Sequence, residues 1–481
     1  MAHPDQTVRE NPVPGQQRKT TLKRSTWLIY IFGVLGGLNW GYDTGVISAA
    51  LVYLRPDFDL TSWTEGFVVT GLIAGAVIGA AFGGRFSDKY GRRPVLMVTA
   101  VVFVIAPLGM AFAPSTEVLI LFRFIVGLGT GLAAVTLPVY LSEIAPARIR
   151  GKVTGFYALS IVIGQFLGFL IGLAFSPMES WRWMLGLSVI PSVLFALGLF
   201  VVWETPRWLV RRGREEEARE LLHRDRTPEE AQRELDEIHA IQKAEESIGV
   251  KGLKALLQPW VRPILWVGLG VAALCQLMGI NTIMYFAPTT LQNVGFTDQA
   301  AIASNLIIGV MNILAVWLAL ARADRWGRRP LLLAGAAGTF LSLAILAAVN
   351  LLLPTPDGFG AVGVLTLTCM AVYVFMFQMS WGAITWVLLG EIFPLGVRAA
   401  AMGVATTALW LANGVVSLAF SPLLEAVGVG ALFAGFAVIC FIALVFTIRF
   451  VPETKGRSLE EIEERFRTGT IPTVPKSPAR G

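Results

Sequence analysis

Two residues of opposite charge stand inside long apolar runs of the sequence. Asp43 lies in the run near residues 27–51, and Arg123 lies in the run near 118–144. Counted at 1.5 Å per residue, they lie about 10 Å and about 8 Å from the ends of their helices on one side of the bundle, hence at similar depth. A lone charge inside a bilayer is costly, so both side chains should face the protein interior, either paired or in a water-filled cavity.

This pair predicts proton chemistry. A carboxylate can bind and release a proton, and the three histidines, His3, His223 and His239, all lie outside the apolar runs. Asp43 is therefore the candidate proton-coupling group, with Arg123 as its partner. The alternative is a static ion pair that only braces two helices. We favour the functional interpretation, because a brace would not need a titratable group at this depth.

A second set of polar and aromatic side chains gathers in the seventh apolar run and in later ones. Asn281 and Tyr285 share a helix face, and Gly279 with Pro288 permits a local break at which backbone groups face a cavity. The other members of the set are Gln276, Asn312, Trp386, Trp410 and Asn413. Amides donate to and accept from sugar hydroxyls, and a flat aromatic ring covers the apolar face of a pyranose. The set predicts a monosaccharide site, although a Trp near a span end is more often an interface anchor.

Three short polar motifs occur twice, in the same order, which indicates an internal duplication. The loop 84–94 recurs as 322–330, and the other two motifs begin at a glutamate in each copy. The charged members are Arg85, Asp88, Arg92, Glu143, Arg150 and Glu204 in the first copy and Asp324, Arg328, Glu391, Arg398 and Glu453 in the second. We predict that they form a conformational latch, which holds the two helical bundles in the outward-facing state and releases during each cycle. In it, Asp88 and Asp324 accept from N–H groups at helix starts and pair with arginines. The alternative is that the basic loops only set topology.

The composition of the 481-residue chain indicates an integral membrane protein. The chain is 55% hydrophobic and 15% charged, with a mean hydropathy of +0.64, which is too apolar for a soluble protein of this length. Its net charge of +6 does not indicate nucleic-acid binding, because the basic residues stand in short loops beside apolar runs. Cys275, Cys369 and Cys440 lie within the runs, so buried free thiols are expected.

The apolar runs predict an all-α membrane protein with twelve transmembrane helices in two pseudo-symmetric six-helix halves. The expected spans lie near 27–51, 65–84, 94–113, 118–144, 152–175, 184–203, 262–290, 299–320, 331–353, 361–392, 399–423 and 429–451. Glycines at 71, 75, 79 and 83, and again at 164, 168 and 172, predict close helix packing in the second and fifth spans. Basic residues are concentrated on one side, which places both termini in the cytoplasm.

The polar segments complete the predicted domains. Residues 1–25 form a disordered cytoplasmic tail, 26–205 the first half, 206–259 a cytoplasmic helical linker, 260–452 the second half and 453–481 a C-terminal cytoplasmic tail. In the linker, Thr227 starts a helix whose apolar face is Leu235, Ile238 and Ile241. A further helix is expected from Ser458 in the C-terminal tail.

The duplicated loops, the Glu-x-x-Pro-x-x-x-Arg elements and Pro452-Glu453-Thr454-Lys455-Gly456 together make this chain resemble the sugar porters of the major facilitator superfamily. The resemblance implies a proton-coupled symporter of the cell membrane, with Asp43 as the proton-carrying acid and Arg123 as its partner. The sugar contacts that the resemblance implies are Gln165, Gln276, Asn281, Asn312 and Trp386. Cys275 and Leu409 stand where glutamines occur in the xylose porter, and the pattern looks equally like the inositol and polyol branch.

We therefore expect a proton-coupled importer of a hexose, a pentose or a cyclic polyol, working by alternating access and functional as a monomer. A passive uniporter of the same fold is one alternative, and a transporter-like sugar sensor is another. No enzyme activity is expected, because no nucleophile with a base lies in the spans. No cofactor, metal or nucleic acid is expected as a partner; the partners are the sugar or polyol, the proton and the lipid bilayer.

Overall fold

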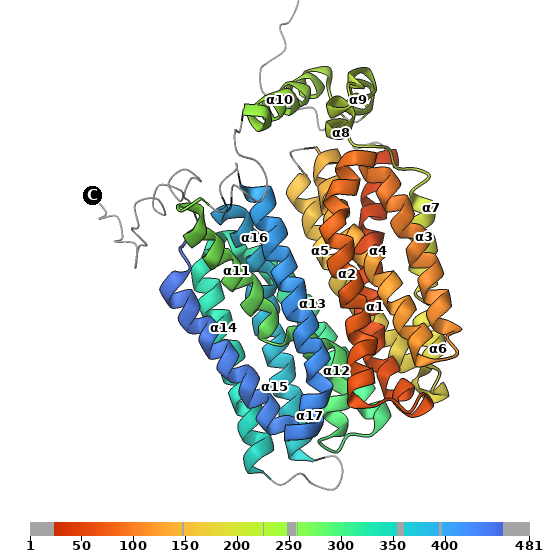
Figure 1. The fold of residues 1–481 in the computed structure, drawn as a ribbon, viewed down its shortest axis with the longest axis vertical. Helices are drawn as coiled ribbons and strands as arrows, with labels where there is room; N and C mark the ends of the chain where they lie inside the picture. The colour runs from red at the N-terminus through yellow and green to blue at the C-terminus, as the bar shows by residue number, and fades with distance from the viewer. Residues whose placement is uncertain are drawn as a thin grey trace, which may run out of the picture.

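The computed structural model describes residues 24–146, 149–224, 226–247, 256, 258–353, 360–393 and 397–455, which contain helices and no strand. Nearly all of the predicted tail 1–25 and the helix predicted from Ser458 lie outside these residues. Figure 1 shows two helical bundles side by side, with a group of short helices at one end.

The first bundle consists of α1 (Arg24–Asp57), α2 (Ser62–Tyr90), α3 (Arg92–Ala111), α4 (Thr116–Ile144), α5 (Arg150–Phe175), the 3-10 turn η1 (Ser176–Met178), α6 (Trp181–Gly186) and α7 (Val189–Gly198). The second consists of α11 (Val261–Leu277), α12 (Ile280–Gln292), α13 (Asp298–Trp326), α14 (Arg328–Leu352), α15 (Ala361–Phe377), the π-helix η3 (Gln378–Gly382), α16 (Ala383–Ile392) and α17 (Arg398–Phe450). Within the described residues, ten helical segments are long and apolar enough to cross a membrane. These ten segments do not include α1, and the long helix α17 is one of the ten.

The two bundles repeat the same local structure at corresponding helix ends. Thr61 caps α2 by accepting from the backbone N–H of Thr64, and Thr297 caps α13 by accepting from Ala300. At the other ends of these helices the chain turns at Gly91 (φ 107°) and Gly327 (φ 85°), a backbone conformation that favours glycine. The duplicated sequence motifs therefore correspond to duplicated structure.

Glycines bring neighbouring helices of the first bundle into backbone contact. A Cβ at Gly75 of α2 would collide with the carbonyl oxygen of Phe124 in α4, and a Cβ at Gly127 of α4 would collide with that of Leu72. The pair α1 and α5 packs in the same way, with Gly164 against the carbonyl of Leu38. The close packing predicted from the glycine spacing is confirmed for these helices.

Three breaks shape the second bundle, and two of them are expected from the sequence. Gly279 separates α11 from α12 with φ 89°, as the seventh span predicts. The π-helix Gln378–Gly382 between α15 and α16 is not expected from the sequence, which predicts one continuous span at 361–392. Gly428 interrupts α17 with φ 75°, where the sequence predicts two separate spans.

The linker forms three short helices, α8 (Pro206–Arg211), α9 (Glu215–Leu222) and α10 (Pro228–Ser247). Its own small core contains Leu209, Leu222, Leu235 and Ile238, whereas Ile241 is exposed, contrary to its predicted place on the apolar face. Thr227 and Glu230 cap α10 reciprocally, each side chain bonding to the other's backbone N–H.

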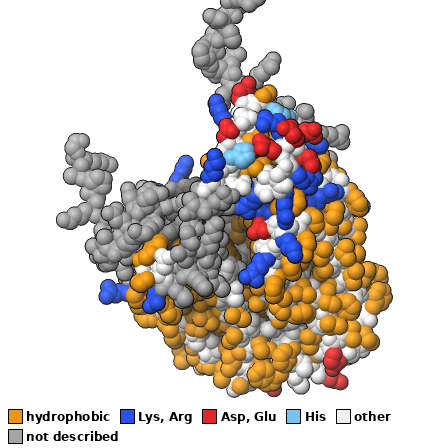
Figure 2. Space-filling model, turned by 45° about the horizontal axis from the view of Figure 1, so that its top comes forward, with side chains coloured by type: hydrophobic (Ala, Val, Ile, Leu, Met, Phe, Trp, Pro, Cys, Tyr) orange, Lys and Arg blue, Asp and Glu red, His pale blue; other side chains and the backbone are white. Residues whose placement is uncertain are grey.

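The linker is attached to the first bundle. Trp208 Nε1 donates to the carbonyl of Asp88 at 3.1 Å, and Arg226 Nη2 donates to the carbonyl of Ile144 at 3.1 Å. Figure 2 shows charged side chains gathered over this end of the molecule, while the flank below is covered by hydrophobic side chains. This distribution matches a protein whose flank faces lipid.

Candidate functional site

Asp43 and Arg123 form a buried ion pair between α1 and α4. Arg123 Nη1 lies 2.7 Å from Asp43 Oδ2, and the two residues are 4% and 1% exposed. Arg123 Nε also donates to the carbonyl of Val68 in α2 at 3.1 Å. The pairing predicted from equal depth is present, and it connects three helices of the first bundle.

Two of the predicted amides join the bundles at mid-depth. Asn312 Nδ2 of α13 donates to Gln165 Oε1 of α5 at 2.7 Å. The Oδ1 atom of Asn312 is buried and has no partner among the described residues. A buried acceptor without a partner is costly, so this oxygen can accept from a ligand hydroxyl at little expense in desolvation.

The second amide pair stands at the break between α11 and α12. Asn281 Nδ2 donates to Gln276 Oε1 at 2.7 Å, across the turn at Gly279. Both residues are partly exposed. Each amide also has donor or acceptor groups beyond this bond, which is what recognition of vicinal hydroxyls requires.

The aromatic candidates divide into a buried group and an exposed one. Trp410 is buried against Trp40, with ring centroids 5.9 Å apart, and Tyr285 and Asn413 are buried as well. Trp386 of α16 is 42% exposed, and among the described residues no ring contact or hydrogen bond joins it to the others. The structure therefore does not bring Trp386 into the buried group.

Three polar or aromatic residues of this region are missed by the sequence analysis. Trp40 precedes Asp43 by three residues, a spacing that places both on one helix face and could have indicated it. Asn305 Nδ2 donates to Ser48 Oγ at 2.9 Å, from α13 to α1. Neutral residues such as Ser48 and Asn305 give no signal in a sequence until the rotation of their helices is known.

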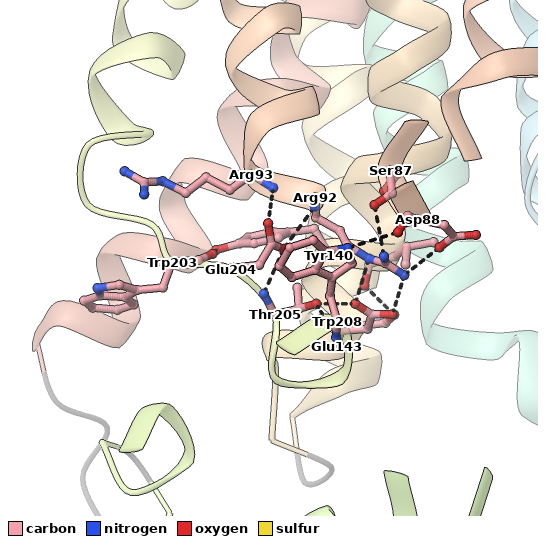
Figure 3. A network of polar contacts seen from close by, with 12 residues as sticks. Ser87, Asp88, Arg92, Arg93, Tyr140, Glu143, Trp203, Glu204, Thr205 and Trp208 are labelled. Atoms are coloured by element: carbon pink, nitrogen blue, oxygen red, sulfur yellow. Dashed lines mark hydrogen bonds and ion pairs between the residues drawn. The ribbon is translucent and has the colours of Figure 1, made fainter. Parts of the chain in front are cut away.

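At the linker end, the first copy of the duplicated motifs forms a network of polar contacts (Figure 3). Arg92 donates to Glu143 through Nε and Nη2 at 3.1 and 3.2 Å and lies 3.1 Å from Asp88. Thr205 Oγ1 donates to Glu143 at 2.6 Å. Glu204 accepts from the backbone N–H groups of Arg92 and Arg93, which open α3.

The second copy repeats the network in the other bundle. Arg328 donates to Glu391 at 2.8 Å, and Glu453 accepts from the backbone N–H groups of Arg328 and Arg329 at 3.1 Å. Thr454 Oγ1 donates to Glu391, as its counterpart does in the first copy. A carboxylate at a helix N-terminus and a bidentate arginine both favour a fixed loop geometry.

The networks differ from the prediction in two respects. Among the described residues, each network joins elements of its own bundle and does not link the two bundles. The acceptor of the N–H groups at the helix start is Glu204, whereas Asp88 is 62% exposed and bonds through its side chain to Arg92. The side chain of Asp324 lies outside the described residues. Of the remaining predicted members, Arg85 is exposed on α2, Arg150 begins α5, and Arg398 donates from Nε to the carbonyl of Phe393 at 3.0 Å.

Comparison with known proteins gives concordant matches over nearly the whole chain. A family model described as "Sugar (and other) transporter" matches residues 29–466. The D-xylose transporter of Levilactobacillus brevis is 38% identical over 450 residues, covering 93% of this chain and 97% of that protein. The major myo-inositol transporter IolT of Bacillus subtilis is 39% identical over 446 residues, covering 91% and 94%.

A solved structure matches as well. The proton:xylose symporter XylE of the major facilitator superfamily, bound to 6-bromo-6-deoxy-D-glucose, superposes with a TM-score of 0.76 at 32% identity, covering 93% of this chain and 100% of that one.

Proposed function

The chain belongs to the sugar transporter family of the major facilitator superfamily, and we propose that it is a symporter that imports a monosaccharide or cyclic polyol together with a proton. The observation that carries the proposal is the buried pair of Asp43 and Arg123, 2.7 Å apart between α1 and α4. When Asp43 is ionised, Arg123 holds it; when Asp43 is protonated, the pair loosens and Arg123 can take other partners. Proton occupancy thereby biases the side to which the cavity opens.

The driving force is sufficient for steep accumulation. One proton moving inward releases about 2.3 kcal/mol per 100 mV of membrane potential, and each pH unit adds about 1.4 kcal/mol. At about 150 mV and about half a pH unit, this supports a sugar gradient of roughly 10³.

We further propose twelve spans in two six-helix halves, with the predicted domain boundaries. At 1.5 Å per residue, the 53 residues of α17 would extend about 80 Å, more than twice the hydrocarbon core of about 30 Å, so Gly428 divides two spans. The span in α1 completes the set. The linker side is cytoplasmic by its basic loops, which places both termini of a multi-pass cell-membrane protein there.

The amides support a polyhydroxylated substrate. Gln165 and Asn312 belong to opposite bundles. A sugar ring whose hydroxyls bond to both amides therefore has a complete binding site only when the two halves close around it. Cys275 and Leu409 make the surroundings less polar than two glutamines would. The less polar surroundings favour a substrate that makes fewer hydrogen bonds on the side facing Cys275 and Leu409. Both a monosaccharide and an inositol remain candidates. Relatives named as xylose and myo-inositol transporters support the same two classes.

Uptake into proteoliposomes tests the proposal. With an imposed proton gradient, the purified protein should accumulate its substrate above equilibrium, and a protonophore should abolish the excess. A thermal-shift panel of glucose, xylose, arabinose, galactose and inositol selects the substrate beforehand. Equilibration without accumulation would favour the passive uniporter, and binding without any transport would favour the sensor.

A further inference from the structure

The ends of the bundles farthest from the linker are joined by a reciprocal set of hydrogen bonds. Ser421 Oγ of α17 donates to Glu65 Oε2 of α2 at 2.8 Å, and Ser62 Oγ of α2 donates to Glu425 Oε2 of α17. Each helix thus contributes one serine and one glutamate. We call these four residues the clasp.

Within the clasp, Glu65 is enclosed far more completely than a carboxylate at a helix end usually is. It is 1% exposed, and its Oε1 atom has no partner among the described residues. The next residue, Gly66, packs so closely that a Cβ there would lie 2.7 Å from the carbonyl oxygen of Leu418. The two helices therefore leave little space for water to solvate the free oxygen while they remain together.

The charges around Glu65 compensate it only in part. Arg55 of α1 lies 3.4 Å from Oε2, but its own side chain is 42% exposed and its charge is shared with solvent. Glu425 of α17, which accepts from Ser62 within the clasp, adds a second negative charge nearby. An ionised Glu65 would thus retain a buried, unsolvated oxygen, whereas a protonated one removes the charge and can bond as a donor.

We propose that Glu65 is a second proton-binding group of this transporter, and that a proton on it stabilises the state in which the clasp is closed. The proposal rests on the alternating access proposed above, because it requires α2 and α17 to separate in the other state. On separation, Glu65 meets water and its carboxylate ionises, so the proton leaves to the linker-distal side. The proton enters and leaves on the same side, so Glu65 changes the pH dependence of transport without adding to the number of protons coupled to each sugar.

The distance between α2 and α17 measures this directly. Nitroxide labels at Trp63→Cys and Leu423→Cys sit on exposed positions of the two helices, while the native cysteines are buried. Without sugar, electron-electron distance measurements should give the short distance at low pH and a growing longer component as the pH rises. If one proton is taken up on closing, the ratio of the closed to the open population changes by up to about tenfold per pH unit.

Variants then assign the effect to one group. Both variants are made in the Asp43→Asn background, in which position 43 cannot titrate. There, Glu65→Gln keeps a neutral clasp and should give the short distance at every pH, whereas Glu65→Ala should give the longer component at every pH. Glu117→Gln removes an exposed carboxylate from the start of α4 and should titrate as the parent does. A label-only control without introduced cysteines sets the background.

The outcomes separate this proposal from the proposed symport. An Asp43→Asn protein whose pH response is unchanged by the further change Glu65→Gln overturns the clasp proposal and leaves the symport untouched. If Asp43→Asn alone abolishes the response, the proton that governs closure is on Asp43 and the clasp proposal fails. A parent without any pH response also overturns the clasp proposal, and uptake into proteoliposomes then decides the symport separately. A response that persists in Asp43→Asn and is lost when Glu65→Gln is added supports the clasp proposal.

Discussion

A carboxylate inside a membrane protein can serve as a brace or as a proton carrier, and substitution by its amide distinguishes the two. Asp43→Asn retains the shape and a hydrogen bond to Arg123, but it cannot titrate. We expect it to abolish accumulation driven by a proton gradient while preserving sugar binding and counterflow exchange. Accumulation that persists in proteoliposomes of Asp43→Asn would make the pair a structural brace.

The amides give a prediction of binding strength. Gln165→Ala and Asn281→Ala each remove an amide that is proposed to bond to a sugar hydroxyl. A hydroxyl left without a partner in the bound complex costs about 1 to 3 kcal/mol, and about 1.4 kcal/mol is a factor of ten in affinity, so each variant should bind sugar tenfold or more weakly.

Calorimetry measures the loss, and a remote amide provides the control. Asn350 donates to Leu346 and Thr366 between α14 and α15, so Asn350→Ala removes an amide without touching the candidate site. It should bind sugar like the parent. Unchanged affinity in both Gln165→Ala and Asn281→Ala would move the sugar site elsewhere.

The sequence identifies a site residue when its type is unusual for its position in a membrane span. Asp43 and Arg123 stand out because charges are rare in apolar runs. Ser48 and Asn305 are ordinary in a membrane helix and do not. Glu65 and Glu425 resemble interface charges in the sequence, since only the packing of α2 on α17 shows that one of them is buried.

Among the helices, the pairing of α2 with α4 makes a test of the glycine contacts. Gly75→Ala places a methyl group against the carbonyl of Phe124, and overpacking of this kind costs about 1 to 3 kcal/mol. Gly435→Ala in α17 is the matched control, because nothing lies within 4 Å of its Cβ position. Thermal unfolding in detergent should show a lower Tm for Gly75→Ala only; equal Tm values would refute backbone contact.

The apolar runs predict that the helices exist. They do not predict where a helix is interrupted, unless a residue type that favours a break, such as glycine, stands there. Gly279 marks its break because its φ of 89° favours a residue without a Cβ. The π-helix at Gln378–Gly382 contains no proline, and its glycine, Gly382, has an ordinary helical φ of −61°, so no residue type announces this break.

For the molecule as a whole, the predicted latch concerns how the bundles move. The Asp88 carboxylate is exposed and pairs with Arg92 of its own bundle, so it is available to a partner across the gap in the other state. We expect Asp88→Asn to shift the population toward the state open on the linker side. Because exposed pairs contribute about 0 to 1 kcal/mol, the shift should be no more than about fivefold.

Labelling of engineered cysteines on the linker side measures this population. Glu216→Gln, which removes an exposed charge from α9, is the control for a general electrostatic effect. If Asp88→Asn leaves both labelling and transport unaltered, the aspartate has no latch role and the basic loop sets topology alone.

The duplication itself is evident from the sequence, since three motifs that recur in the same order indicate two halves of like architecture. The sequence does not show which polar bonds lie within one bundle and which join the two bundles. Both charge networks stay within their own bundle, while the clasp and the amide bridge connect the two. Which end of the two bundles is joined by polar bonds depends on the conformation of the transporter. The same sequence adopts every conformation of the transport cycle, so it does not predict which end is joined in one of them.

The glycine contacts of α1 with α5 and of α2 with α4 also bear on what happens when the lipid is removed. Where a backbone touches a carbonyl directly, as at Gly75 and Gly164, no crevice remains into which a short detergent tail can intrude. Lateral pressure from the bilayer is then dispensable for these pairs. The seam between the bundles combines packing, as at Gly66 against Leu418, with a few polar bonds that water and surfactant can replace. Delipidation should therefore loosen the bundles from each other before it separates these helix pairs.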